Sequence, residues 1–396
     1  MGINRLPLLI TATLQFTTRF GMNFLLQFRL RELNAPLFIV GLLLSIRGGI
    51  SVLMSPLWGS ASDRKGKRKV VILVSVLGSA VSMPLYLFSS QIWQVISVAS
   101  LVAFFSSGFN PVAMALSSEY SSKESSQARE LSLLNSSNSL GMLLSRLLIG
   151  ISLIHLTVRS AMNFFIFLAI FSVIPAFFVR EVPESIPSSA TRMDEKNSKV
   201  LEEITKMMGR KGLWAIYLSS FLRQFGTSGT LSLSAIYLAE KMGMDKSTIG
   251  FISAMNPAFQ IPAHMIFAKI IERTNPKLVA IVGMLLSSGV AFIFLIGKST
   301  VEIGMAYILL GIAFGAFING VAVLITRMTT ARERAQALGL LNSSRQIGFM
   351  MGPMVSGILA TISYNLLFLT MALVMLMGSA VMMIFSAGSD AILKKR

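Results

Sequence analysis

The chain has 396 residues, of which 54% are hydrophobic and only 13% carry a charged side chain. Soluble domains carry about 25% charged residues, so this composition is typical of a membrane protein without a large soluble domain. Because there is no cysteine and there are only two histidines, we expect no disulfide, no thiol nucleophile, no metal centre and no cofactor.

Apolar segments of membrane-spanning length follow one another along the whole chain. A helix needs about 20 apolar residues to cross a bilayer, and inside the bilayer every backbone polar group has to be hydrogen bonded. The sequence therefore predicts an all-α membrane protein with twelve transmembrane helices. The predicted spans are 6–28, 38–58, 70–89, 92–118, 131–154, 160–179, 213–239, 248–271, 278–297, 303–325, 338–361 and 366–385.

A long polar segment divides these spans into six and six. We expect an N-terminal six-helix bundle over residues 1–180, a cytoplasmic linker over 181–212, and a C-terminal six-helix bundle over 213–396. Apolar residues at helical spacing within 200–208 predict a short amphipathic helix on the cytoplasmic membrane face. The simpler interpretation, a linker that joins two halves, suffices for function.

The short polar hairpin between the second and third spans carries a recognisable pattern. It reads G-x-x-x-D-R-x-G-K-R and resembles the signature of the major facilitator superfamily at this place. The resemblance implies a secondary transporter that works by alternating access, binds its substrate between its two halves, and keeps spans 3, 6, 9 and 12 at the periphery. The matching residues are Gly59, Asp63, Arg64, Gly66, Lys67 and Arg68.

The resemblance also implies that this hairpin packs against the start of span 11 and acts as a cytoplasmic gate. Free N–H groups at a helix start attract a carboxylate, so we expect Asp63 to be held there, with Arg334 as a direct partner. Glu272 and Arg273 stand at the equivalent place in the second half and predict a weaker mirror contact near Arg129. The alternative is that Asp63 merely caps a turn.

The two halves repeat each other in sequence. Residues 133–137 match 340–344 (LLNSS), and the glycines that follow keep the same offset of 207, Gly141 with Gly348 and Gly150 with Gly357. Parallel repeats of six spans are the transporter architecture in which substrate binds at the repeat interface. The repeat therefore predicts two pseudo-symmetric bundles.

Positive charge decides the expected orientation. With the N-terminus inside, 24 of the 35 basic residues fall in segments that face the cytoplasm and 6 in segments that face outside. We therefore expect a multi-pass protein of the cytoplasmic membrane with both termini in the cytoplasm. The net charge of +18 then reflects topology, and we expect no nucleic-acid partner.

Arginine is the residue that does lie within the predicted spans, whereas no acidic residue lies in the middle of one. Isolated charges at membrane depth are costly and are usually functional. The predicted substrate-binding residues are Arg47, Arg223 and Arg345, with Arg19, Arg146, Gln224, Gln346, Asn110 and Asn319 around them. Because guanidinium binds carboxylate or phosphate through two hydrogen bonds, we expect a substrate with an anionic group. The alternatives are that these arginines only join helices, or that the protein exports lipophilic cations.

Two coupling motifs of the drug–proton antiporters in this superfamily are altered here. Their arginine shortly before a glycine in span 4 is missing ahead of Gly108, and Ser145-Arg146 replaces their Gly-Pro pair in span 5. A Gly-Pro pair occurs instead at Gly352-Pro353. The sequence therefore leaves open whether transport is coupled to protons.

The sequence as a whole predicts a transporter and not an enzyme. We expect a monomer in the lipid bilayer that exports a small organic compound, as drug and metabolite exporters do. The alternative function is a facilitator or symporter for an anionic metabolite. A sensor or a channel would need a signalling domain or a ring of polar pore residues, and neither occurs in the sequence.

Overall fold

The computed structural model describes residues 5–120, 124–181 and 212–386. Helices dominate these residues, which contain no strand, so the prediction of an all-α protein is confirmed. The predicted linker helix within 200–208 lies outside the described residues.

The chain forms two compact units, and α11 contributes to both. Unit 1 comprises Met1–Thr191 and Gly243–Ala254, and unit 2 comprises Arg192–Met242 and Met255–Arg396. The first turns of α11 therefore pack with the first half of the chain, which the simple division at residue 212 did not anticipate.

Unit 1 begins with two long helices, and three of its predicted spans are each divided into two helical segments. The elements are α1 (Leu6–Glu32), α2 (Leu37–Lys65), α3 (Arg68–Ser82), η1 (Met83–Phe88), α4 (Ile92–Ser106), α5 (Phe109–Glu119), α6 (Glu124–His155), α7 (Val158–Phe171) and α8 (Val173–Phe177).

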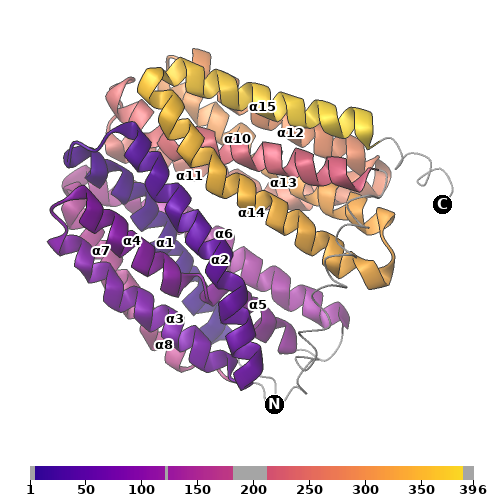
Figure 1. Ribbon diagram of the computed structural model, residues 1–396, viewed down its shortest axis with the longest axis horizontal. Helices are drawn as coiled ribbons and strands as arrows, with labels where there is room; N and C mark the ends of the chain where they lie inside the picture. The colour runs from indigo at the N-terminus through magenta and orange to yellow at the C-terminus, as the bar shows by residue number, and fades with distance from the viewer. Residues whose placement is uncertain (1–4, 121–123, 182–211, 387–396) are drawn as a thin grey trace. The chain divides into compact units, whose positions relative to one another are not determined.

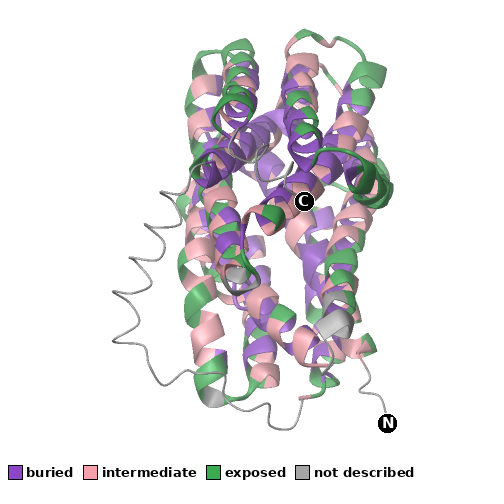
Figure 2. Ribbon diagram, turned by 90° about the vertical axis from the view of Figure 1, so that its right-hand side faces the viewer, coloured by how far each residue is buried: buried purple, intermediate pink, exposed green. Residues whose placement is uncertain are grey.

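The described residues of unit 2 form long helices without such breaks. They are α10 (Leu213–Glu240), α11 (Lys246–Arg273), α12 (Pro276–Ile296), α13 (Thr300–Met328), α14 (Ala331–Ile362) and α15 (Tyr364–Phe385). Helix α10 packs against α14 and α15, and α12 packs against α13 and α15 (Figure 1). In both units the buried residues lie on the faces that helices turn toward one another (Figure 2).

Eight helical stretches in the described residues are long and apolar enough to cross a membrane. They correspond to predicted spans 2 to 6, 9, 10 and 12. The other four predicted spans are α1, α10, α11 and α14, which are 27 to 32 residues long but more polar. The count of twelve transmembrane helices stays a prediction.

The break between α4 and α5 shows how unit 1 satisfies backbone groups that a kink releases. Near Gly108 the regular hydrogen bonding of the helix is interrupted, and the indole Nε1 of Trp58 on α2 donates to the Phe104 carbonyl at 3.0 Å. Ser55, also on α2, donates to the Ser107 carbonyl at 3.1 Å. Side chains of a neighbouring helix thus replace lost backbone bonds, as an irregular segment at membrane depth requires.

The sequence repeat corresponds to one helix contact that occurs in each unit. On α6, a Cβ added to Gly141 would lie 2.7 Å from the Thr13 carbonyl oxygen of α1. On α14, a Cβ added to the matching Gly348 would lie 2.5 Å from the Phe221 carbonyl oxygen of α10. The repeated glycines therefore allow close backbone contact between α1 and α6 in unit 1 and between the corresponding helices, α10 and α14, in unit 2.

Candidate substrate sites and gate

Arg223 is the largest fully buried side chain of unit 2. It lies on α10 with 1% of its surface exposed, and its Nε donates to the Ser287 hydroxyl of α12 at 3.0 Å. Its guanidinium carbon lies 4.5 Å from the centre of the Phe317 ring and 5.6 Å from that of Phe314. Its Nη2 has no hydrogen-bond partner in the described part of the chain. One edge of the guanidinium is thus fixed while the other remains available to an acceptor.

Two further polar groups near this arginine lack partners. Arg345 on α14 is close enough for its charge to act on Arg223, and its buried Nε has no acceptor among the described residues. The Oε1 atom of Gln224, next to Arg223 in the chain, is also buried without a donor. The two positive charges repel each other, and no ion pair found for the described residues involves either of them. An anion between them would therefore be stabilised.

Unit 1 carries a separate set of arginines. Arg47 on α2 has 6% of its surface exposed, and its Nη1 is buried without an acceptor in the described residues. Arg19 on α1 lies within electrostatic reach of Arg47. Arg146 on α6 lies over the ring of Phe24, 4.7 Å from its centre. The structure thus groups the predicted arginines as Arg19, Arg47 and Arg146 in unit 1, and Arg223 and Arg345 in unit 2.

The remaining predicted site residues differ in their hydrogen bonding and in their exposure. Asn319 donates to the His264 carbonyl at 2.8 Å, so its amide joins α13 to α11. Asn110 is half-buried at the start of α5, and Gln346 is exposed on α14. Of these three, only Asn319 has an evident structural task.

Sequence reasoning missed several residues that complete these surroundings. Ser287 and Phe317, which hold Arg223, are ordinary members of apolar spans, and nothing in their local sequence marks them. Tyr86 is 2% exposed, has a hydroxyl without a partner in the described residues, and lies within electrostatic reach of Arg47. A tyrosine two residues after a proline in an apolar run was the signal that could have singled it out.

The signature hairpin is held together by an ionic cluster within unit 1. Arg68 pairs with Asp63 at 2.6 Å and with Glu119 of α5 at 2.6 Å. Glu181 accepts from the backbone N–H groups of Arg68 and Lys69 at 2.5 and 3.0 Å. Gly66 ends α2 in the left-handed region with φ +60°, where glycine is favoured. The hairpin thus joins the end of α2 and the start of α3 to the end of α5 and to the segment that follows α8.

A tyrosine extends this cluster. Burial, together with the nearby carboxylates of Glu181 and Glu119, raises the pKa of Tyr120 to about 12. Its hydroxyl therefore stays protonated at neutral pH and donates to the Arg180 carbonyl at 3.1 Å.

The start of α14, where Asp63 was expected to be held, has a cap of its own. The Glu333 carboxylate accepts from the Thr330 hydroxyl at 2.9 Å and from the Thr330 backbone N–H at 3.4 Å, which forms a capping box. Arg334 is exposed, as are Glu272, Arg273, Arg64 and Lys67, and a Cβ added to Gly59 would meet nothing within 4 Å. The helix start thus depends less on an outside carboxylate than the sequence implied.

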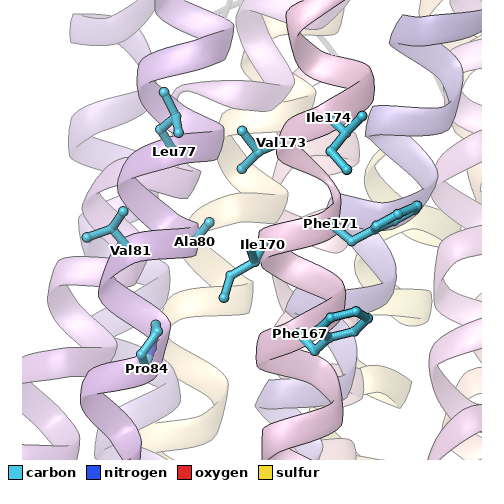
Figure 3. Close-up of a pocket in the computed structure, with 9 residues that line it drawn as sticks. All are labelled: Leu77, Ala80, Val81, Pro84, Phe167, Ile170, Phe171, Val173 and Ile174. Carbon is cyan, nitrogen blue, oxygen red and sulfur yellow. The ribbon is translucent and has the colours of Figure 1, made fainter.

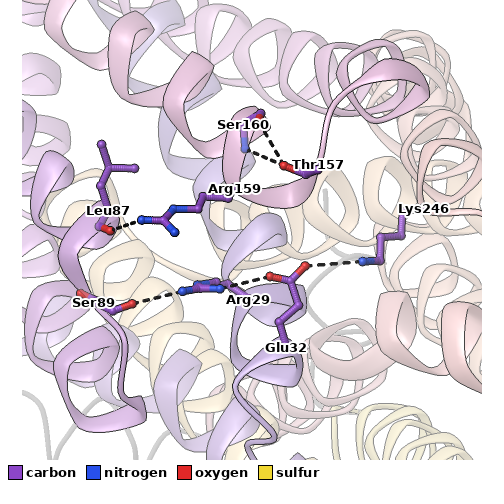
Figure 4. A network of polar contacts seen from close by, with 8 residues as sticks. All are labelled: Arg29, Glu32, Leu87, Ser89, Thr157, Arg159, Ser160 and Lys246. Carbon is purple, nitrogen blue, oxygen red and sulfur yellow. Dashed lines mark hydrogen bonds and ion pairs between the residues drawn. The ribbon is translucent and has the colours of Figure 1, made fainter.

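The opposite end of unit 1 carries a second polar network (Figure 4). Glu32 at the end of α1 pairs with Arg29 at 3.4 Å and with Lys246 of α11 at 3.8 Å. Ser247 donates to the Gly150 carbonyl of α6 at 2.8 Å. A Cβ added to Gly250 would lie 2.7 Å from the Gly150 backbone nitrogen. These contacts bind the first turns of α11 to α1 and α6.

A cavity of about 780 Å³ lies beside α3, η1, α7 and α8 (Figure 3). All its lining residues are apolar, and Val81 and Phe167 are 71% and 66% exposed. Without a polar group it offers nothing to orient a charged substrate, and its surface is suited to lipid tails. No group of three or more metal-ligating side chains occurs in the described residues.

Arg47 and Arg223, buried in bundles of membrane-length helices without a carboxylate partner among the described residues, are typical of a membrane transporter. The sequence matches the Major Facilitator Superfamily over residues 8–222 and 216–392, and the chain belongs to this family. The family consists of transporters and not of enzymes. This confirms the predicted family and the prediction that the protein is not an enzyme.

Curated relatives and solved structures agree with this family. Multidrug resistance protein MdtG of Salmonella typhimurium is 27% identical over 347 residues, which cover 86% of this chain and 83% of the relative. The crystal structure of the nucleoside transporter NupG matches with a TM-score of 0.79 at 15% identity, covering 97% of this chain and 99% of that one. The human organic anion transporter MFSD10 matches with a TM-score of 0.68 at 16% identity, covering 95% and 98%.

Proposed function

We propose that this protein exports a small organic compound that carries an anionic group, working by alternating access in the cytoplasmic membrane. The observation that carries the anionic group is the pair of buried Arg223 and half-buried Arg345 in unit 2, neither of which has a carboxylate partner among the described residues. Each of these arginines keeps a buried nitrogen without an acceptor among the described residues. A buried donor left without a partner costs about 1–3 kcal/mol, and more when charged, so the pair is best explained by a ligand that supplies a negatively charged acceptor.

The direction of transport rests on the relatives. The multidrug resistance protein at 27% identity favours export, whereas the nucleoside transporter among the structural matches shares only the fold. The second candidate, a facilitator or symporter for an anionic metabolite, uses the same arginines and differs in coupling.

A set of matched compounds tests this function. The purified full-length protein in liposomes is assayed for flux of 2-naphthoate, 2-naphthamide and 2-naphthylmethylamine, which have similar shapes but negative, neutral and positive charge. We expect flux of the carboxylate well above the amide and the amine, and a dependence on an imposed pH gradient would identify proton coupling. Preferred flux of the amine would contradict the proposal.

The signature hairpin is proposed to act as the gate on the cytoplasmic side. Asp63 is 53% exposed in its side chain, and an exposed ion pair such as that with Arg68 contributes about 0–1 kcal/mol, so Asp63→Asn should fold normally. We expect this variant to lose at least about 10-fold in transport rate, because the Asp63 carboxylate controls the mobility of the hairpin. A 10-fold loss in rate corresponds to an increase of about 1.4 kcal/mol in the barrier to transport.

The matched control is Glu272→Gln, at the equivalent place in the second half. Its side chain is exposed, and the change should reduce transport less than Asp63→Asn does. Initial rates in liposomes are compared at equal amounts of folded protein. Wild-type transport by Asp63→Asn would rule out the gate.

A further inference from the structure

Arg47 and Tyr86 are two buried side chains of unit 1 that each carry a polar atom without a hydrogen-bond partner among the described residues. Arg47 lies on α2 with 6% of its surface exposed, and Tyr86 lies on η1 with 2% exposed. The Nη1 atom of Arg47 and the hydroxyl of Tyr86 both lack a hydrogen-bond partner among the described residues. The two groups lie within electrostatic reach of each other. Two groups that can donate hydrogen bonds, from different helical segments, are therefore buried with neither of them bonded to a described residue.

Such an arrangement is unusual because buried polar groups are normally hydrogen bonded. Leaving a buried donor without an acceptor costs about 1–3 kcal/mol, and more for a charged group. The described carboxylates of unit 1 whose contacts are resolved are engaged elsewhere. Glu32 pairs with Arg29 and Lys246, and Asp63 and Glu119 pair with Arg68. Glu130 pairs with Arg5, and Glu181 and Asp245 accept from backbone N–H groups.

The chemistry of the pair decides which ligand it fits. A guanidinium and a phenol hydroxyl both donate hydrogen bonds, and the guanidinium adds a permanent positive charge. A second positive charge, Arg19, lies within electrostatic reach of Arg47. Cations are therefore repelled, whereas an oxyanion would accept one hydrogen bond from Arg47 and one from Tyr86.

We propose that Arg47 and Tyr86 form a second oxyanion-binding site, which lies within unit 1 and takes a carboxylate or a phosphate group. It is distinct in its residues from the Arg223 site of unit 2 and extends the proposed function, on which its role in transport rests. Tyr86 is its discriminating residue, because it donates a hydrogen bond that an arginine alone does not supply.

Binding to the purified full-length protein tests this site. Isothermal titration calorimetry with 2-naphthoate and with inorganic phosphate separates an organic carboxylate from free phosphate. The titrations are made in the Arg223→Met background, where the site of unit 2 is removed. We expect Arg47→Gln to weaken binding of the preferred oxyanion at least 10-fold, and Tyr86→Phe to weaken it about 3- to 10-fold.

The double variant and a control sharpen the result. If Arg47 and Tyr86 hold the same oxyanion, the effects of the two substitutions are not additive. The double variant should then bind the oxyanion no more than about 3-fold more weakly than Arg47→Gln does. The control is Arg159→Gln, an exposed arginine of the same unit that donates to the Leu87 carbonyl, and its affinity should equal that of the parent. Tyr86→Phe removes no hydrogen bond seen in the structure, so it should fold as the parent does.

The outcomes separate this site from the transport function. Unchanged affinity in both Arg47→Gln and Tyr86→Phe, or no binding of either oxyanion to the Arg223→Met protein, would overturn the site, whatever the flux. Oxyanion binding that depends on Arg47 and Tyr86, together with preferred flux of the amine, would support the site and contradict the proposed function.

Discussion

Replacing Arg223 with methionine is expected to abolish transport of the anionic substrate while the protein stays folded. Burial of the guanidinium costs about 2.5–3.5 kcal/mol on insertion scales. Its hydrogen bond to Ser287 returns about 0.5–1.5 kcal/mol, and its stacking on Phe317 returns up to about 2 kcal/mol. Because these terms nearly cancel, we expect the free energy of unfolding to change by no more than about 1 kcal/mol.

The loss of function should be far larger than this change in stability. A bidentate contact with an oxyanion contributes about 3 kcal/mol or more, so transport should fall at least about 100-fold. Arg223→Lys keeps the charge but not the bidentate geometry and should lose about 10-fold. Ser287→Ala frees the Nε that is now fixed and should fall between wild type and Arg223→Lys.

Thermal unfolding in detergent and flux in liposomes are measured on the same preparations. Arg223→Met protein that melts like wild type but transports nothing would support the binding role. A variant that unfolds, yet whose folded fraction transports normally, would show that Arg223 serves only to join α10 to α12.

The all-α fold and its repeat could be predicted because each rests on a local or periodic signal. Apolar runs of about 20 residues and the offset of 207 between matching glycines are visible in the sequence alone. The structure then shows Gly141 and Gly348 making the same backbone contact. Several helices extend beyond the predicted spans, by seven residues at the end of α2 and at the starts of α6 and α14, because polar residues continue the helix outside the apolar run.

The breaks within spans were missed although each has a local signal. Pro84, Pro111 and Pro175 lie at the three breaks, and a proline has no N–H for the carbonyl four residues earlier. How the released carbonyls near Gly108 are satisfied is not local, because Trp58 and Ser55 lie about 50 residues earlier in the chain. The membership of the first turns of α11 in unit 1 likewise follows from Gly150 and Gly250 meeting, a contact that no local pattern predicts.

The candidate sites could be predicted only as far as charge goes. A charge within an apolar run is conspicuous, so the arginines were found. The residues around these arginines are not conspicuous in the sequence. Only the packing of the helices brings Ser287 and Phe317 to Arg223, and Tyr86 within electrostatic reach of Arg47. The capping box of Glu333 was also missed, although Thr-x-x-Glu is a local signal that should have been applied.

Adding one methyl group at Gly352 is expected to destabilise unit 2 strongly, whereas the same change at Gly339 on the same helix should not. A Cβ at Gly352 would lie 2.3 Å from the Phe225 carbonyl oxygen and 2.3 Å from the Ser228 hydroxyl, both on α10. Because a backbone carbonyl cannot rotate away, α14 would have to move off α10. Overpacking of this kind costs about 1–3 kcal/mol or more.

Gly339→Ala is the matched control because nothing lies within 4 Å of its added Cβ. Alanine in a helix interior is more favourable than glycine by about 0.5–1 kcal/mol, so this variant should be at least as stable as wild type. Thermal unfolding of both purified variants measures the difference, and we expect opposite signs for the same chemical change. If Gly352→Ala melted at or above the temperature of Gly339→Ala, the backbone contact between α10 and α14 would not be what holds unit 2 together.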